Sequence, residues 1–102
     1  MNQAAMLAQV RKMQAEMTKA QEELATTVVT GSAAGGMVTV EMTCDLRVKA
    51  VRVDKSALDP DDVETLEDLL MVAVNHALAK AQETSGKRMS SVTGGLRIPG
   101  VT

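Results

Sequence analysis

The chain contains no phenylalanine, tyrosine or tryptophan among its 102 residues, and methionine, leucine and valine fill the large apolar positions instead. A core without aromatic rings lacks the side chains that bury the most surface, so we expect the folded state to depend on burial against a second copy. The absence also removes the platforms on which many proteins stack the bases of single strands or RNA loops. That mode of nucleic-acid binding is therefore disfavoured.

Cysteine and histidine each occur once. Cys44 has no partner for an internal disulfide, which is typical of a reducing compartment, and we expect the cytoplasm. His76 follows an apolar run in a helical pattern and is predicted to lie at an interface or to be hydrogen-bonded. One cysteine and one histidine do not make a metal site or a nucleophilic catalytic centre. We therefore expect no enzyme activity, no catalytic residue, no metal and no other cofactor.

Long apolar runs are also absent, since no stretch approaches the roughly 20 residues that cross a bilayer. We therefore expect a soluble protein without a membrane partner. The formal charge is only −2, with a pI near 5.3, which argues against indiscriminate binding to polyanions. However, seven of the 13 acidic residues fall within residues 59–85, where Lys80 is the single base. An anionic partner should avoid the beginning of that segment and contact bases elsewhere.

Residues 59–86 carry the strongest helical signal of the chain. Asp59 is a suitable N-cap, Pro60 suits the first helical position, and the acidic residues that follow suit the positive end of a helix dipole. The helix is predicted to reach Gly86 and can continue to about Met89. Every side chain from 69 to 74 is apolar, and one sheet covers only one face of a helix, so a second subunit is expected there. The predicted dimer interface comprises Leu66, Leu69, Leu70 and Val74.

The first 26 residues contain neither glycine nor proline and are rich in helix-forming side chains. They predict a helix whose apolar residues, spaced alternately by four and three, form a seam for a partner helix: Met6, Val10, Met13, Met17, Ala20 and Leu24. The opposite side is polar, and two interpretations remain open for its bases. They form a solvated face, or Arg11, Lys12 and Lys19 contact phosphates.

Beyond the first helix the apolar period changes from 3.6 to two residues, which indicates strands. Residues 27–30 predict a short strand, 31–36 a Gly-rich turn, and 38–45 a strand with alternating apolar and polar side chains. Residues 47–54 predict a third strand, in which a change of parity indicates a bulge near Ala50. Four bases either protect this strand as an edge or bind a ligand: Arg47, Lys49, Arg52 and Lys55.

A chain of this length is the size of one domain. We predict that residues 1–92 form this domain. Glycines and a proline recur after residue 93, which favours irregular structure, so residues 93–102 are predicted to be a flexible Gly-rich tail.

The order of these segments resembles the YbaB/EbfC family of bacterial nucleoid-associated DNA-binding proteins. The resemblance covers the whole chain and rests on QVRKMQAEMTKAQEEL, GGMVTVEMT, VKAVRVDKSALDPDDVETLEDLLMVAVNHALAKA and TGGLRIPG. It implies an α+β fold with an N-terminal helix, a three-stranded antiparallel sheet and a long C-terminal helix, assembled as a tweezer-like homodimer. One departure is the turn between the second and third strands, where the family usually has glycines and this chain has Cys44, Asp45 and Leu46.

The resemblance further implies that the homodimer binds duplex DNA in the cytoplasm and organises the nucleoid, with an influence on gene expression or DNA repair. The acidic start of the second helix directs phosphates to bases elsewhere. The predicted DNA-binding residues are Arg11, Lys12, Lys19, Lys87 and Arg88. An alternative stays open, namely a protein-interaction module that docks on a recombination or replication protein without touching DNA.

Overall fold

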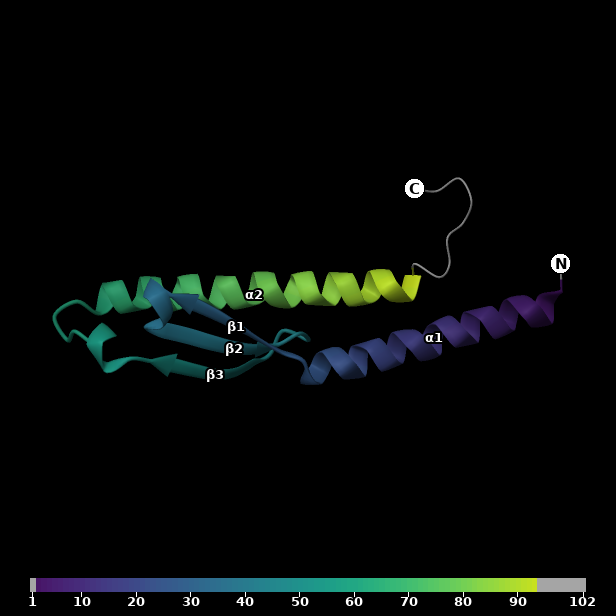
Figure 1. Cartoon of the computed structure of the whole chain (residues 1–102), viewed down its shortest axis with the longest axis horizontal. Helices are drawn as coiled ribbons and strands as arrows, with labels where there is room; N and C mark the ends of the chain where they lie inside the picture. The colour runs from purple at the N-terminus through teal and green to yellow at the C-terminus, as the bar shows by residue number, and fades with distance from the viewer. Residues whose placement is uncertain (1, 94–102) are drawn as a thin grey trace, which may run out of the picture.

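Two helices and a three-stranded sheet make up the computed structural model, which describes residues 2–93 (Figure 1). The elements follow in the order α1 (Gln3–Thr26), β1 (Val28–Ala33), β2 (Val38–Thr43), β3 (Val48–Val53) and α2 (Val63–Thr93). Short 3₁₀ turns, η1 (Ala34–Gly36) and η2 (Lys55–Ala57), precede β2 and follow β3. The predicted α+β class and order of elements are confirmed.

Helix α1 occupies nearly the whole segment for which a helix was predicted. It begins after Asn2, whose side-chain oxygen accepts a hydrogen bond from the backbone N–H of Ala4 at 3.0 Å and so satisfies one of the free donors of the first turn. Ala20 and Leu24 are its only buried residues. Residues 2–12 are all exposed, so residues 13–93 leave the first half of α1 uncovered.

Helix α2 begins later than predicted. The carbonyl of Asp59 accepts the N–H of Asp62 at 3.0 Å, so this residue closes a turn ahead of the helix. The helix starts at Val63, and the carboxylate of Asp62 accepts both the backbone N–H of Thr65 at 3.3 Å and its hydroxyl at 2.6 Å. Asp62 therefore has the capping role assigned to Asp59, and Pro60 lies in the preceding turn. Both positions carry the same chemistry, which is why the sequence did not distinguish them.

The sheet has the strand order β1-β2-β3, with antiparallel pairing throughout. The alternation predicted for the second strand is confirmed, because its apolar set is buried while Thr39 and Glu41 are half-exposed. The buried set comprises Val38, Val40, Met42 and Cys44. These side chains form the centre of the core beneath α2.

The predicted bulge in the third strand is also confirmed. Glu41 pairs with Ala50, whereas the next residue of β2, Met42, pairs with Val48. Lys49 is therefore the extra residue without a partner on β2. Because of this extra residue, Val48 lies on the same side of the sheet as Val51 and Val53, the side that faces α2, although the apolar spacing along β3 changes.

Strand β1 is longer than the four residues predicted for it, because Gly31 is part of the strand and not of the turn. A Cβ atom at Gly31 would lie only 2.7 Å from the Cα of Ala77 and would overlap the carbonyl oxygen of Ala73. Glycine is thus used here for close approach between strand and helix. Ala73 and Ala77, both with no exposed surface, are the complementary small residues on α2.

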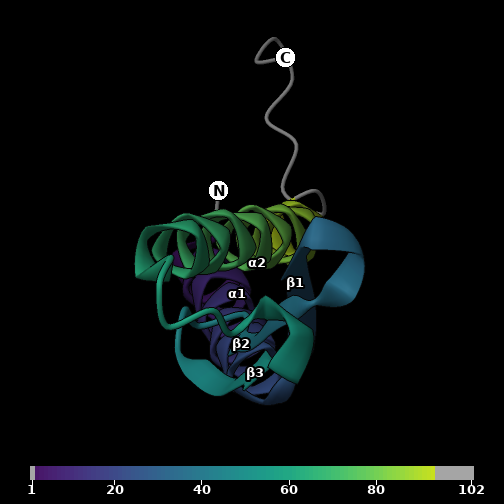
Figure 2. The same ribbon diagram turned by 90° about the vertical axis from the view of Figure 1, so that its left-hand side faces the viewer.

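Helix α2 covers β1 and β2 but leaves β3 uncovered (Figure 2). His76 and Lys80 on α2 reach over the free edge of β1. Nδ1 of His76 accepts the backbone N–H of Ser32 at 3.0 Å, and Nζ of Lys80 donates to the carbonyl of Thr30 at 2.9 Å. The prediction of a hydrogen-bonded histidine is confirmed, and these contacts occupy backbone groups on which another strand could pair.

The molecule is elongated, with extents of 71 × 26 × 17 Å and a radius of gyration of 19.8 Å, against about 13 Å for a compact chain of 100 residues. Both helices extend past the sheet on the same side, and α1 continues beyond the end of α2 (Figure 1). Helix α2 runs to Thr93, which is the first residue of the predicted tail. Residues 94–102 lie outside the described part of the chain.

Candidate nucleic-acid interface

We call residues 3–19 of α1 the arm, because most of this segment projects from the sheet (Figure 1). Arg11, Lys12 and Lys19 are exposed on it. Lys12 and Lys19 share one side of the helix because they are seven residues apart. Within residues 2–93, none of the three bases forms a salt bridge or a side-chain hydrogen bond. Their charges are therefore accessible to an anionic partner.

Of the two predicted contacts on α2, Lys87 remains at the surface. Its Nζ lies 3.2 Å from Oε1 of Glu83 one turn away, and its side chain is 78% exposed. Exposed pairs of this kind within a helix are weak and exchange readily with other charges. Lys87 therefore remains available to a phosphate.

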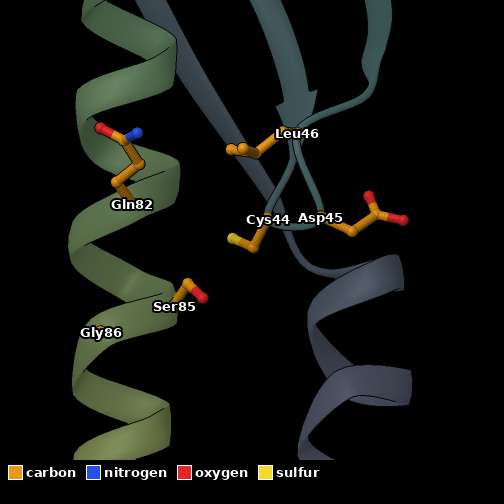
Figure 3. A pocket seen from close by; sticks show the side chains of 6 residues that line it. All are labelled: Cys44, Asp45, Leu46, Gln82, Ser85 and Gly86. Carbon is orange, nitrogen blue, oxygen red and sulfur yellow. The ribbon is translucent and has the colours of Figure 1, made fainter.

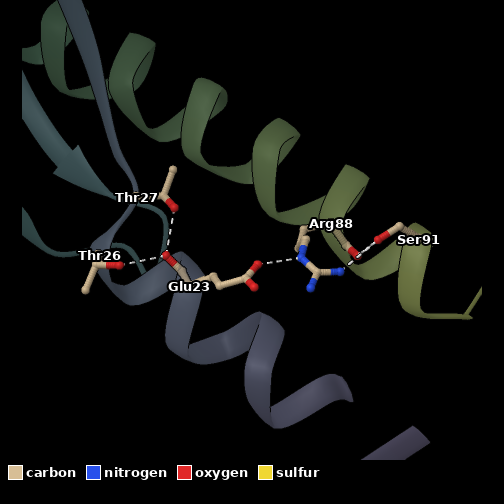
Figure 4. Close-up of polar contacts among 5 residues, drawn as sticks. All are labelled: Glu23, Thr26, Thr27, Arg88 and Ser91. Atoms are coloured by element: carbon tan, nitrogen blue, oxygen red, sulfur yellow. Dashed lines mark hydrogen bonds and ion pairs between the residues drawn. The ribbon is translucent and has the colours of Figure 1, made fainter. Parts of the chain in front are cut away.

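Arg88 is placed differently, since its guanidinium joins the two helices (Figure 4). Nε of Arg88 lies 2.9 Å from Oε2 of Glu23 on α1, and Nη1 donates to Oγ of Ser91 at 2.9 Å. The hydrogen bond with Arg88 lowers the pKa of the Glu23 carboxyl, and the same bond raises the pKa of Arg88. Sequence reasoning missed this pair, because 65 residues separate its members.

The competing bases lie on or beside β3, which is part of the sheet, whereas the arm projects from the sheet (Figure 1). Arg47 is 3.7 Å from Asp45, and Arg52 is 3.8 Å from Glu41. Both distances approach the limit for an ion pair, and the arginine side chains are 84% and 72% exposed. The charges of these arginines are partly neutralised by neighbouring acids. Such bases on an uncovered strand fit the interpretation that they protect the edge of the sheet.

The acidic start of α2 and the arm lie at opposite ends of the molecule (Figure 1). The exposed acids at the start of α2 lie at the end of the long axis opposite to the arm (Figure 1): Asp59, Asp61, Asp62, Glu64. Because like charges repel, an anionic partner is disfavoured at that end. The geometry thus keeps the predicted acidic and basic regions apart in space.

The four residues predicted for a dimer interface are half-buried against the chain's own core. Met71, beside them, is 58% exposed. It lies on the side of α2 away from His76, toward the uncovered strand β3. By strand register, two exposed valines of β3 share the helix-facing side of the sheet. Together these residues form what we call the apolar flank, comprising Val48, Val51, Met71, Val74 and Leu78.

A pocket of about 400 Å³ lies between the β2–β3 turn and α2 (Figure 3). It is lined by Cys44, Asp45, Leu46, Gln82, Ser85 and Gly86. Burial raises the pKa of the Cys44 thiol, and the nearby charge of Asp45 raises it further, against a hydrogen bond with Thr84 that lowers it. The thiol is therefore protonated at neutral pH and weakly nucleophilic. Among residues 2–93, no cluster of three or more histidine, cysteine, aspartate or glutamate side chains is arranged to hold a metal.

Comparison with known proteins shows the family of the chain. The pattern that defines the YbaB/EbfC DNA-binding family matches residues 1–96. The chain belongs to the YbaB/EbfC family. A nucleoid-associated protein of Chloroflexus aurantiacus is 46% identical over 97 residues, which are 95% of this chain and 97% of the relative. One from Afipia carboxidovorans is 47% identical over 96 residues, which are 94% and 91% of the two chains.

A solved structure has a similar fold. The crystal structure of an uncharacterised protein from Helicobacter pylori matches with a TM-score of 0.76 and 24% identity, over 95% of this chain and 99% of that one. At this identity the likeness supports the fold alone. In the described part of the chain, neither helix has the length and apolar character needed to span a membrane.

Proposed function

We propose that this YbaB/EbfC-family chain binds duplex DNA as a homodimer in the cytoplasm and contributes to the organisation of the nucleoid. The family description and the names of relatives with about 45% identity support the DNA and nucleoid parts of the proposal. The proposal assigns no catalytic step and no cofactor to the chain. An influence on gene expression or DNA repair would follow from occupancy of DNA.

The observation that carries the proposal is the arm with its three accessible bases. Most of the arm stands clear of the sheet, so a DNA duplex can approach it without meeting the acidic start of α2. Phosphate contacts by lysine and arginine give affinity without sequence information. The arm therefore supports binding to many sequences, as organisation of a nucleoid requires.

The apolar flank supports the homodimer. It combines exposed valines of β3 with Met71, Val74 and Leu78 of α2, and no other described element of the same chain covers it. A second copy related by two-fold symmetry would bury this surface and hold two arms in one molecule. Two projecting arms around a joined centre give the tweezer-like shape.

The test is fluorescence anisotropy with a labelled duplex of arbitrary sequence at low salt. We expect saturable binding that weakens as salt is raised, because counterions released from DNA oppose binding at high salt. A second duplex of unrelated sequence should bind with similar affinity. Absence of binding to both duplexes at low salt would overturn the proposal.

A protein-interaction module that docks on a recombination or replication protein is the second candidate. One specific observation favours it, since Met6, Leu7 and Val10 on the arm are 51%, 57% and 47% exposed. Exposed apolar side chains on one helix suit a groove on another protein. This alternative predicts no duplex binding in the anisotropy assay, so one experiment separates the two candidates.

A further inference from the structure

The contact between Glu23 and Arg88 joins the last turn of α1 to the C-terminal part of α2. Glu23 lies in the last turn of α1, and Arg88 lies in the part of α2 that extends past the sheet (Figure 4). Nε of Arg88 is 2.9 Å from Oε2 of Glu23, while Ser91 accepts from Nη1 at 2.9 Å. Ser91 in turn donates to the carbonyl of Arg88 at 2.7 Å. The guanidinium is therefore held from two sides.

The backbone at the end of α1 is held as well. The carbonyl of Glu23 accepts the hydroxyls of Thr26 at 3.1 Å and Thr27 at 2.7 Å (Figure 4). The side chain of Glu23 therefore belongs to a helix end that local hydrogen bonds hold in place. In contrast, only two side chains of α1, Ala20 and Leu24, are buried, and both lie near the end of the helix that joins the sheet. A shallow contact of this kind defines the angle between two helices poorly.

Small changes of angle at this point become large at the arm. Arg11 is 12 residues from Glu23, which corresponds to about 18 Å of helix. A tilt of about 10° would move Arg11 by about 3 Å, which is the length of a hydrogen bond between charged groups. Exposed ion pairs add little to folding stability, so the effect of this pair lies in geometry.

We propose that Glu23 and Arg88 form a clasp that fixes the angle of the arm against α2, so that Arg88 is a positioning residue for DNA binding and not a phosphate contact. The clasp itself follows from the described contacts, whereas its consequence for DNA rests on the proposed function. Arg88 differs in this respect from Arg11, Lys12 and Lys19, whose side chains form no salt bridge within residues 2–93.

The first experiment measures the arm directly. Spin labels are placed on cysteines introduced at Gln9 of α1 and Asn75 of α2, both exposed, with buried Cys44 left in place. Dilution with unlabelled protein restricts the measurement to distances within one chain. Glu23→Ala and Arg88→Ala should each broaden the distance distribution, and the double variant should broaden it no further, because both substitutions remove the same contact.

The matched control is Glu22→Ala, which removes the same charge from the neighbouring exposed position and has no partner in the described structure. It should keep the narrow distribution of the parent. Glu23→Ala with the distribution of the parent would overturn the clasp. So would broadening that is additive in the double variant.

The second experiment uses the DNA-binding assay, in which the clasp and a phosphate contact predict opposite signs. Glu23→Ala removes an acid and frees Arg88, so a phosphate-contacting Arg88 would make binding tighter than in Glu22→Ala. The clasp predicts binding several-fold weaker than in Glu22→Ala, with an unchanged dependence on salt because no phosphate contact is lost. Tighter binding by Glu23→Ala would overturn the positioning role. If the parent bound no DNA, the proposed function would fail, and the distances would still decide the clasp.

Discussion

At Gly31, the absence of a side chain decides how closely α2 approaches the sheet. An added Cβ would overlap the helix backbone at Ala73 and Ala77, so strand and helix would have to separate. The alanines at 73, 77 and 81 have no exposed surface, which shows that the contact is tight along three turns. The small residues on α2 and the glycine in β1 together allow the helix and the strand to pack closely.

We expect Gly31→Ala to lower the free energy of unfolding by about 1–3 kcal/mol or more, the usual cost of forcing extra volume into a packed core. Thermal unfolding followed by circular dichroism measures this change. The matched control is Gly86→Ala, since a Cβ there meets nothing within 4 Å and alanine is favoured in a helix by up to about 1 kcal/mol. Equal or higher stability of Gly31→Ala would contradict the packing described here.

Single residues also show what sequence alone did not predict. Leu46 adopts a left-handed backbone conformation with φ of 68° in the turn between β2 and β3. Its N–H donates to the carbonyl of Thr43 at 2.9 Å, and Thr43 donates back to the carbonyl of Arg47 at 2.8 Å. These hydrogen bonds hold the turn closed despite the unfavourable φ of a leucine. The φ of a turn residue depends on the strands that the turn connects. The presence of leucine in the sequence therefore does not predict a left-handed conformation.

At the scale of elements, the sequence predicted the features that depend on neighbouring residues. Helix α1, the alternation in β2 and the bulge in β3 follow from residue spacing and were predicted. The errors have physical reasons. Asp59 and Asp62 are equivalent caps by sequence, and only the turn geometry selects Asp62. Strand β1 was predicted too short, because glycine and alanine at its end are placed by their fit to α2 and not by strand propensity.

The candidate site was predicted less completely than the fold. Arg11, Lys12 and Lys19 were found as bases on a helix, and the structure shows them exposed; their contact with DNA remains a prediction. The partner of Arg88 and the exposed valines of the apolar flank were missed, because both depend on segments distant in sequence that meet only in the folded chain.

The join between α1 and α2 should depend on acid pH. The bond to Arg88 lowers the pKa of Glu23 below its ordinary value of 4.5. The join therefore contributes stability above that value and loses it as pH falls through the lower pKa of the folded state. We expect the thermal midpoint to decrease below pH 4.5, and to decrease less in Glu23→Gln. The lowered pKa of Asp54, which accepts hydrogen bonds from Ser56, adds a decrease common to both proteins. Identical pH profiles would contradict the lowered pKa of Glu23 in the folded state.

At the scale of the whole molecule, the proposed dimer places a second copy on the apolar flank. Met71 is 58% exposed in the single chain, so an aspartate there should leave the fold of one subunit intact. In the dimer it would bury an unpaired charge, which costs several kcal/mol. We expect sedimentation velocity to show a dimer for the parent and a monomer for Met71→Asp, with similar helical content.

Leu70→Asp gives the comparison for that measurement. Leu70 is half-buried against the chain's own core, so a charge there should reduce thermal stability as well as association. A parent that sediments as a folded monomer at micromolar concentration would contradict the dimer. A Met71→Asp variant that remains dimeric would show that the interface lies elsewhere.

The most direct test of the account is the salt dependence of DNA binding. If about three bases per subunit neutralise phosphates, a dimer makes roughly six contacts, and the logarithm of affinity should fall with the logarithm of salt at a slope of about −5. Arg11→Glu with Lys12→Glu should weaken binding to every duplex and flatten this slope, whereas Ala at Arg47, Lys49 and Arg52 should leave both nearly unchanged. Loss of binding in the strand variant, with the parent slope retained in the arm variant, would contradict the central claim that the arm holds the DNA.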